Sequence, residues 1–395
     1  MPAAAVKKEP ASSKSSWNKI KPHVQPIYQT SVFDYPDLDT LDDFYNGLIP
    51  EGYLYSRNGL PNSDSLGKLV AQSENCEAGV VCSSGMAALS VAFFSFAKSG
   101  DHIVASSDLY GGTTVFLREE LSRLGIKTSF VNISRPEDVE IALGIENTKL
   151  VLVETISNPA MKVCDIGKIS KLAHNAGALL IVDNTMANPF VVKPFELGAD
   201  IVMHSGTKFL GGHHDITIGV LCGRSNEMKR ATQFSSRVGT ISGPFDSWLA
   251  CRSFQTWKLR TERSCENASK LAEYLDERKD VVPKVYFPGL KTDPSHKLAS
   301  EMFTRGKYGA MLSFDLNSPD KAGSFVKALS SIKLAPSLGG VRTTISHPGK
   351  TSHRNISREE RNRSGITDAM IRVSVGIEEY ESIEADFDRA LAEAK

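Results

Sequence analysis

Strand-like and helix-like segments alternate along the first two thirds of the chain. Short apolar runs are typical of buried parallel strands, and longer amphipathic stretches between them are typical of helices. The predicted strands cover residues 79–82, 103–105, 128–131, 150–153, 178–183 and 199–204. The predicted helices cover residues 61–74, 84–97, about 113–124, a segment from 136 onward, and 165–176. The alternation predicts an α/β fold with a mostly parallel sheet that is covered by helices on both faces.

The pattern changes after Gly243. Residues 245–275 are predicted to form one long helix. Shorter strands follow at 309–316 and 371–375, together with a helix at 379–393. This mixture predicts a smaller C-terminal α+β domain. We therefore divide the chain into an N-terminal tail and arm (1–60), an α/β domain (61–247), and a long helix with the C-terminal domain (248–395).

Charge and composition are those of an ordinary globular enzyme. Of 395 residues, 41% are hydrophobic and 23% charged, and the 46 basic residues balance the 46 acidic ones. A net charge of zero argues against broad attraction to nucleic acid or to an anionic membrane, and no apolar run is long enough to span a bilayer. Residues 1–16 lack the apolar core of a secretory signal and are expected to be disordered. We expect a cytoplasmic protein.

The six cysteines form no CxxC pair. Several lie in apolar runs, so they are expected to be buried free thiols in a reducing compartment. His213, His214 and Asp215 are adjacent, but no further ligand is spaced to complete a metal site. We therefore expect no bound metal.

Lys208 lies just after the predicted strand 199–204, within the sequence SGTKFLGGHHD at 205–215. A lysine amine can condense with an aldehyde such as that of pyridoxal 5'-phosphate (PLP). Nearby serine and threonine hydroxyls can donate hydrogen bonds to the phosphate of this cofactor. Most lysines are solvated surface charges, so this motif needs support from a second feature.

Asp183 provides that support, because it ends the apolar run 178–183. Ligands of α/β proteins bind at the carboxyl ends of the strands, and PLP needs an acidic partner for its pyridinium nitrogen. The alternative is that Asp183 only caps a turn before Asn184. Together with Lys208, Asp183 favours a PLP enzyme.

Three further segments fit the same site. Residues 83–88, SSGMAA, open a helix whose N-terminus favours an anion such as the cofactor phosphate, although routine capping explains a Ser-Gly pair equally well. Tyr110 follows a strand and is placed to stack on the pyridine ring or to move protons; the alternative is a tyrosine packed over a glycine turn. Arg57, beside Tyr55, suits a phosphate clamp.

Together these motifs resemble one family, the Cys/Met-metabolism PLP enzymes. It includes cystathionine γ-lyase, cystathionine γ-synthase, cystathionine β-lyase, methionine γ-lyase and O-acylhomoserine sulfhydrylase. The resemblance runs from about residue 24 to the C-terminus. It rests on YSRxGxP at 55–61, SSGMAA at 83–88, DLYGGT at 108–113, ETxSNP at 154–159, VDNT at 182–185, SGTKFLGGHHD at 205–215, SLGG at 337–340 and RVSVGIE at 372–378.

The resemblance implies the fold and the cofactor chemistry. The fold is that of the PLP-dependent transferases (fold type I). Lys208 forms the Schiff base with PLP and moves protons, Asp183 pairs with the pyridinium nitrogen, and Tyr110 stacks on the ring and takes part in leaving-group chemistry. The residues implied to hold the phosphate are Gly85, Met86, Ser205 and Thr207.

The resemblance also implies how substrate and neighbouring subunits are bound. Tyr55 and Arg57 reach the phosphate in the neighbouring subunit, so the homo-oligomer is at least a dimer, and tetramers are usual in the family. Arg372 binds the carboxylate of a small amino-acid substrate, with Ser337 nearby, and Asn158 lies near the phenolic oxygen of the cofactor.

Arg342 departs from the family pattern, since cystathionine γ-lyases commonly carry a glutamate there. That glutamate lies where the distal ammonium of cystathionine binds. An arginine would repel this ammonium by about 3 kcal/mol at ~5 Å, and would favour an acidic distal group such as that of O-succinyl- or O-phosphohomoserine. The alternative is that Arg342 faces solvent and residues 346–353 shape the pocket.

Three functions remain open on these residues. The first is a carbon–sulfur lyase of transsulfuration that cleaves cystathionine or a related γ-substituted amino acid to a 2-oxo acid, ammonia and a thiol. The second is γ-replacement, which joins an O-activated homoserine to cysteine or sulfide. The third is a PLP-binding protein without turnover.

Overall fold

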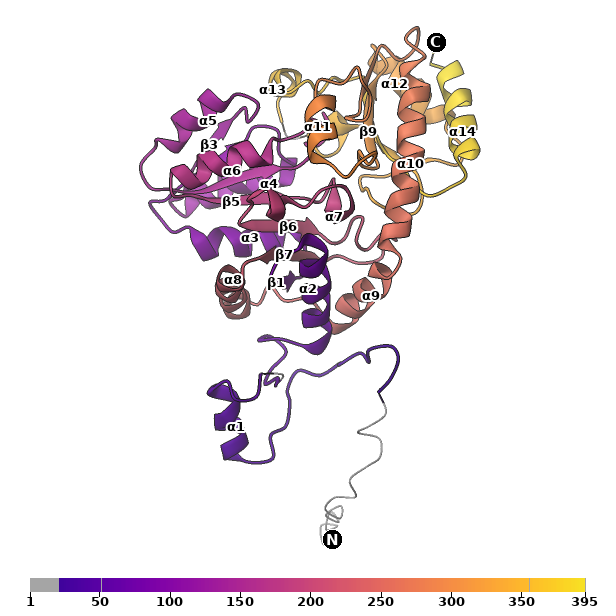
Figure 1. Ribbon diagram of the computed structural model, residues 1–395. Coiled ribbons are helices and arrows are strands. Elements are labelled where there is room, and N and C mark those ends of the chain that lie inside the picture. Colours follow the sequence, from indigo (N-terminus) through magenta and orange to yellow (C-terminus); the bar gives the residue numbers. More distant parts are fainter. Residues whose placement is uncertain (1–20, 51, 355, 395) are drawn as a thin grey trace, which may run out of the picture.

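The computed structural model describes residues 21–50, 52–354 and 356–394. An N-terminal arm leads into a large sheet with its helices, and a smaller sheet with its own helices follows (Figure 1). The tail predicted to be disordered, residues 1–16, lies outside the described residues. The three predicted segments correspond to visible parts of the chain, but their independence as domains stays a prediction.

The larger sheet has seven strands in the spatial order β1-β7-β6-β5-β4-β2-β3. Only β7 runs against its neighbours β1 and β6, so the sheet is mostly parallel, as predicted. The strand β7 itself was absent from the sequence-based prediction. The strands are β1 (Ala78–Cys82), β2 (His102–Ser106), β3 (Lys127–Val131), β4 (Thr148–Glu154), β5 (Leu179–Asp183), β6 (Ile201–Ser205) and β7 (Gly219–Gly223).

Helices cover both faces of this sheet because alternate strand residues point to opposite sides. Ile181 packs with Phe93 and Met228 on one face, whereas Val182 packs with Ile169 on the other. The first face is covered by α3 (Gly85–Phe96), the π-helical segment Phe116–Leu121 that continues α4 (Gly111–Val115), and α8 (Ser225–Val238). The second face is covered by α2 (Pro61–Glu74), α5 (Pro136–Leu143), α6 (Ile166–Asn175) and α9 (Pro244–Phe254).

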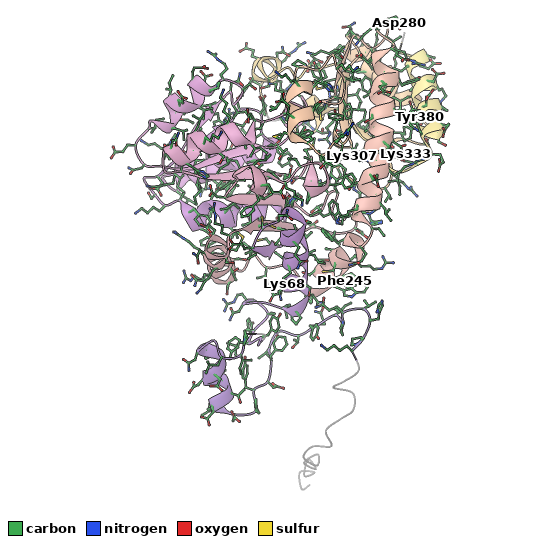
Figure 2. The ribbon with its side chains drawn as sticks, in the orientation of Figure 1. Lys68, Phe245, Asp280, Lys307, Lys333 and Tyr380 are labelled. Atoms are coloured by element: carbon green, nitrogen blue, oxygen red, sulfur yellow. The ribbon has the colours of Figure 1, made fainter. Side chains whose placement is uncertain are left out.

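The predicted long helix 245–275 is in fact two helices, α9 and α10 (Trp257–Asp276). The helical hydrogen-bond pattern breaks at Thr256, whose φ and ψ are −112° and 3°. Beside the break, the carbonyl of Ser253 accepts a hydrogen bond from the buried guanidinium of Arg260. The prediction of one helix was wrong at this point, where the same carbonyl also accepts from the Thr256 N–H. Figure 2 labels Phe245 near the start of α9 and Asp280 just beyond the end of α10.

The smaller sheet has five strands in the order β10-β11-β12-β9-β8. Its strands are β8 (Lys284–Tyr286), β9 (Met311–Asp315), β10 (Lys333–Leu334), β11 (Thr344–Ser346) and β12 (Met370–Ser374). A separate hydrophobic core joins this sheet to α10, α12 (Pro319–Ala328) and α14 (Tyr380–Ala392). The remaining helices are α7 (Asn188–Val191), α11 (His296–Met302), α13 (Arg358–Arg363) and the 3-10 turns Pro194–Leu197 and Pro348–Lys350.

The N-terminal arm projects from this body (Figure 1). Its helix α1 (Leu38–Tyr45) has no buried residue, and Leu38 and Tyr45 are 77% and 66% exposed. One link to the body is a hydrogen bond from Trp248 Nε1 to the carbonyl of Gln25. Among the described residues, no helix combines the length and apolarity needed to cross a bilayer.

Candidate active site

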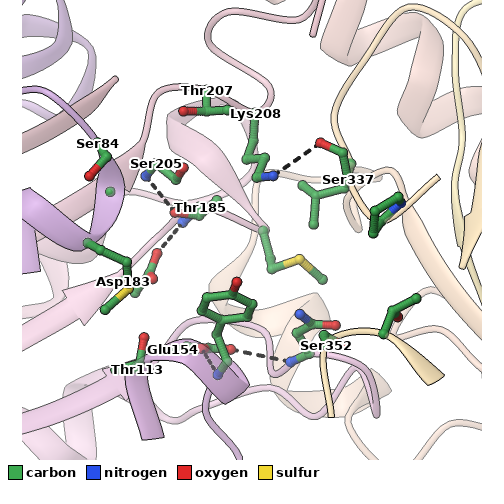
Figure 3. Close-up of a pocket in the computed structure, with 18 of the residues that line it drawn as sticks. Ser84, Thr113, Glu154, Asp183, Thr185, Ser205, Thr207, Lys208, Ser337 and Ser352 are labelled. Carbon is green, nitrogen blue, oxygen red and sulfur yellow. Dashed lines mark hydrogen bonds between the residues drawn. The ribbon is translucent and has the colours of Figure 1, made fainter. Parts of the chain in front are cut away.

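A cavity of about 680 Å³ opens where the carboxyl ends of β4, β5 and β6 meet the C-terminal part of the chain. Its floor carries Glu154, Asp183 and Lys208, and Arg372 of β12 lines it from the smaller sheet. Figure 3 shows Lys208 and Asp183 projecting into the same space. The location follows the general rule for ligand sites in α/β sheets.

Lys208 lies in a tight turn directly after β6. Its backbone N–H donates to the carbonyl of Ser205, and its carbonyl accepts from the N–H of Gly212. The Nζ atom lies 3.1 Å from Ser337 Oγ. Burial, with a smaller contribution from the positive charge of Arg372, lowers the pKa of the Lys208 ammonium. A lowered pKa makes the neutral amine more available as a nucleophile and as a base.

Arg260 supports this turn from below, a role that the sequence analysis missed. Its guanidinium donates to the carbonyls of Phe209 and Leu210 at 3.0 and 3.1 Å. Gly212 has φ +77°, and a Cβ atom there would lie 1.7 Å from Arg260 Nη1. Both the backbone conformation and the available space therefore require glycine at position 212, four residues after Lys208.

Asp183 and Glu154 are neighbours in the sheet register of β4 and β5. Asp183 Oδ1 accepts from the Thr185 N–H at 2.9 Å. Glu154 accepts from the N–H groups of Tyr110 and Asn158 at 2.6 and 3.3 Å. Burial raises the pKa of both carboxyls, and the charge of Asp183 raises the pKa of Glu154 further. The pair can therefore hold a proton on Glu154 while Asp183 faces a cation.

The N-terminus of α3 forms an anion site on another side of the cavity. Ser84 Oγ caps the helix by accepting from the Ala87 N–H, which leaves the N–H groups of Gly85 and Met86 without helical partners. A Cβ atom on Gly85 would lie 2.9 Å from Ser205 Cβ, so only glycine leaves room there. Thr207 also lines the cavity, and its Oγ1 accepts from the Ile218 N–H.

Arg372 is a buried guanidinium without a carboxylate partner among the described residues. It is 5% exposed and donates to Asn158 Oδ1 at 2.9 Å and to the Ser337 carbonyl at 3.0 Å. Its Nε has no hydrogen-bond partner within the part of the chain that the structure describes. Burial lowers the pKa of Arg372 to about 10, so it stays charged at neutral pH. An uncompensated buried cation is a good receptor for a ligand carboxylate.

The structure also locates the other predicted residues. Tyr110 lines the cavity and is 43% exposed. Tyr55 and Arg57 lie on the arm away from the cavity of their own chain, where Arg57 donates to the Ser236 carbonyl. Arg342 is exposed and does not line the cavity.

The position of Arg342 agrees with the alternative that it faces solvent, since it is exposed and does not line this cavity. The neighbouring backbone is tied inward, because the Val341 N–H donates to the Gly212 carbonyl and its own carbonyl accepts from Ile377. Thr343 next to it is buried and hydrogen-bonded to Glu378. With both neighbours held in the body, the Arg342 side chain is left at the surface. Residues 350–352 line the cavity instead.

The sequence analysis also left Lys350 and Arg354 unassigned, although both line the cavity. Their only signal in the sequence was their position in the loop before the last predicted strand. Thr185 ends the VDNT motif at 182–185, but the sequence predicted no role for it. Its Oγ1 accepts from the Ser205 N–H and so joins the ends of β5 and β6.

The residues present fit PLP. A glycine cradle at a helix N-terminus suits a phosphate, the buried Asp183 suits a pyridinium N–H, and Lys208 with its lowered pKa suits an aldehyde. The fold and this set of donors define the class of PLP-dependent enzymes of fold type I.

Comparison with known proteins supports this class. The model of the family "Cys/Met metabolism PLP-dependent enzyme" matches residues 7–392. Cystathionine gamma-lyase of Bacillus subtilis (strain 168) is 41% identical over 93% of both chains. L-methionine gamma-lyase of Fusobacterium nucleatum subsp. polymorphum is 39% identical over 93% of this chain and 92% of its own. The chain belongs to the Cys/Met-metabolism family of PLP-dependent carbon–sulfur lyases and γ-synthases.

A solved structure extends the comparison to the fold. Cystathionine gamma synthase from Xanthomonas oryzae pv. oryzae, in complex with cystathionine, superposes with a TM-score of 0.88 at 34% identity, over 94% of this chain and 93% of its own. Lyases and a synthase are thus similarly close to this chain. Family membership therefore leaves the reaction open between elimination and replacement.

Proposed function

We propose that the protein is a carbon–sulfur lyase that cleaves cystathionine or a related γ-substituted amino acid. With water, γ-cleavage of cystathionine yields 2-oxobutyrate, ammonia and cysteine. The observation that carries the proposal is the meeting of Lys208, Asp183 and Arg372 around one cavity of about 680 Å³. These three residues supply a proton carrier, an anion for a heterocyclic cation and a carboxylate receptor.

Lys208 and Asp183 are assigned to the chemistry, as the sequence analysis predicted. Bound PLP supplies an aldehyde for the substrate amine and an electron-accepting ring. Lys208 removes the proton at Cα, which its lowered pKa favours because the amine is more often neutral. Asp183 holds the ring nitrogen of the cofactor in its protonated form.

Arg372 is assigned to the α-carboxylate of the substrate. Its contacts with Asn158 and with the Ser337 carbonyl orient the guanidinium. Ser337 Oγ also contacts Lys208 Nζ, so the carboxylate receptor and the proton carrier are adjacent. Tyr110, on the exposed side of the cavity, is assigned to stacking on the cofactor and to the leaving group.

The phosphate of the cofactor is assigned to Gly85, Met86, Ser205 and Thr207, completed by Tyr55 and Arg57 from a neighbouring subunit. The exposed arm and the distance of these two residues from their own cavity support this assignment. The proposed assembly is at least a dimer, with a tetramer as the usual form of the family, and the proposed location is the cytoplasm.

The second candidate is γ-replacement, in which an O-activated homoserine and cysteine give cystathionine and the free acid. The similarity to a cystathionine gamma synthase favours it. Lys208, Asp183 and Arg372 would serve both reactions, because both begin with proton transfer at Cα. Only the products separate the two candidates.

The test is to incubate PLP-loaded protein with L-cystathionine and to identify products by mass spectrometry. We expect 2-oxobutyrate and cysteine; pyruvate and homocysteine would show β-cleavage instead. A parallel reaction contains an O-acylhomoserine and cysteine. Cystathionine formation there, without cleavage in the first reaction, would replace the lyase proposal by γ-replacement.

The control is Lys208→Ala, which should abolish both reactions and the visible absorption of lysine-bound PLP. If the wild-type protein shows that absorption but turns over no substrate of either kind, the protein binds PLP without this activity.

A further inference from the structure

Two cations at the open side of the cavity have no role in the functions assigned so far. Lys350 and Arg354 both line the cavity and are exposed, unlike the buried Arg372. Exposed lining residues lie where a cavity meets solvent. A substrate held by Arg372 at its α-carboxylate and by Lys208 at Cα would extend its γ-substituent away from these buried groups, toward that opening.

Neither cation has a counter-charge of its own. Lys350 and Arg354 make no ion pair and no side-chain hydrogen bond with any described residue. Two carboxylates of the same segment are engaged by other arginines: Asp368 pairs with Arg358 and Arg361, and Glu360 pairs with Arg118. Glu359 is exposed and does not line the cavity. The charges around Lys350 and Arg354 are therefore not neutralised within the described chain.

The only two carboxylates among the described residues that line the cavity are Glu154 and Asp183. Both are on the floor at the ends of β4 and β5, where burial raises the pKa of the Glu154 carboxyl. On the open side, therefore, no carboxylate that lines the cavity offsets the positive charges of Lys350 and Arg354.

The segment that carries these cations is held in a defined shape. The Arg354 N–H donates to the Thr351 carbonyl, and the His353 N–H donates to the Pro348 carbonyl. A Cβ atom on Gly111 would lie 2.2 Å from the carbonyl oxygen of Ser352, so the segment packs directly on the start of α4, beside Tyr110. This close approach keeps the segment at the edge of the cavity (Figure 3).

We propose that Lys350 and Arg354 form an anion subsite that selects amino acids whose γ-substituent ends in an acidic group. Suitable substrates are homoserine esters of a dicarboxylic acid or of phosphate, in which the acid leaves from Cγ as its anion. Two cations suit such a group better than the distal end of cystathionine, where an ammonium accompanies the carboxylate. The inference rests on the second candidate function, γ-replacement, for its substrate class, and it assigns acid selectivity to Lys350 and Arg354 rather than to Arg342.

A binding experiment tests the subsite without requiring turnover. Dissociation constants of the PLP-loaded protein are measured by calorimetry for L-2-aminopimelate and L-2-aminoheptanoate. These ligands differ only in a terminal carboxylate against a methyl group, and neither has a leaving group at Cγ. We expect wild-type protein to bind aminopimelate at least about tenfold more tightly.

The double variant Lys350→Met/Arg354→Met should bind both ligands with nearly equal affinity, and the affinity for aminoheptanoate should change less than about threefold. The matched control Lys149→Met/Arg305→Met removes the same two charges from exposed positions that do not line the cavity. It should keep the preference. The subsite is refuted if wild type shows no preference, or if the control loses it equally.

Turnover then identifies the acid. We compare kcat/KM for O-acetyl-, O-succinyl- and O-phospho-L-homoserine in wild-type and double-variant protein. Selective loss for the succinyl ester identifies a carboxylate substrate, and selective loss for the phospho ester identifies a phosphate. Equal loss for all three esters contradicts the subsite. Absence of turnover for all three esters, together with an intact binding preference, refutes γ-replacement on these substrates and leaves the subsite standing.

Discussion

The floor of the cavity and its open side differ in burial and in origin. The floor groups Asp183 and Glu154, together with Arg372 beside them, are enclosed, and burial shifts the pKa of each of these three. Lys350 and Arg354 are exposed and come from a loop between β11 and β12. Buried charged groups cost free energy unless they are paired, so they are expected to act on the part of the molecule that all substrates share. Exposed cations carry a smaller cost and can select among substrates. The comparison assigns reaction type to the floor and selectivity to the opening.

The largest effect is expected at Asp183. Asp183→Asn removes the anion that faces the cofactor, so kcat should fall by about 10²–10³-fold for every substrate. Affinity for PLP, measured by equilibrium dialysis, should weaken as well. The matched control is Glu154→Gln, because an amide resembles the protonated carboxyl and keeps an acceptor for the Tyr110 N–H. A loss in Glu154→Gln as large as in Asp183→Asn would show that the proton is not held on Glu154.

Arg372→Lys should have the next largest effect. Lysine cannot form the planar fork that contacts Asn158, Ser337 and a carboxylate together. We expect kcat/KM to fall about 10²-fold, mainly through KM, and by the same factor for neutral and acidic γ-substituents. A loss confined to acidic substituents would place the distal group, rather than the α-carboxylate, at Arg372. Substrate selectivity would then not lie with the exposed residues at the opening alone.

His353 lies in the segment that joins the two regions, and it should make stability depend on pH. Burial, with the charges of Arg372 and Arg361, lowers its pKa to about 4. The unfolded chain, with a pKa of about 6.5, therefore binds more protons between pH 6.5 and 4, so stability falls as pH falls through this window. At pH 5 the loss from this residue is about 2 kcal/mol.

Urea unfolding at pH 7 and pH 5 measures this loss. His353→Gln should lose less stability between the two pH values than wild type does, by about 2 kcal/mol. The exposed His23 provides a control, since His23→Gln should keep the full dependence. An unchanged dependence in His353→Gln would show that other groups cause it.

Much of the larger sheet was predictable because each strand and helix has a local signal. The predicted helix 61–74 coincides with α2, and the predicted strands fall within or overlap β1 to β6. The signal failed at residues 255–256, where both flanking segments are helical and the Ser253 carbonyl at the break accepts from both Thr256 and Arg260. It also missed β7, a short apolar strand that begins and ends with glycine.

The sequence by itself determined the family and the cofactor and predicted Lys208 and Asp183 for the floor, because their motifs are contiguous and each lies at the end of one strand. Only the tertiary structure decided which distant residues meet. Arg372 and Asn158 are 214 positions apart yet share a hydrogen bond, and Lys350 and Arg354 line the cavity while Arg342 does not. Local propensity determines where an element begins and ends, but long-range packing determines which face of a loop is turned toward the cavity.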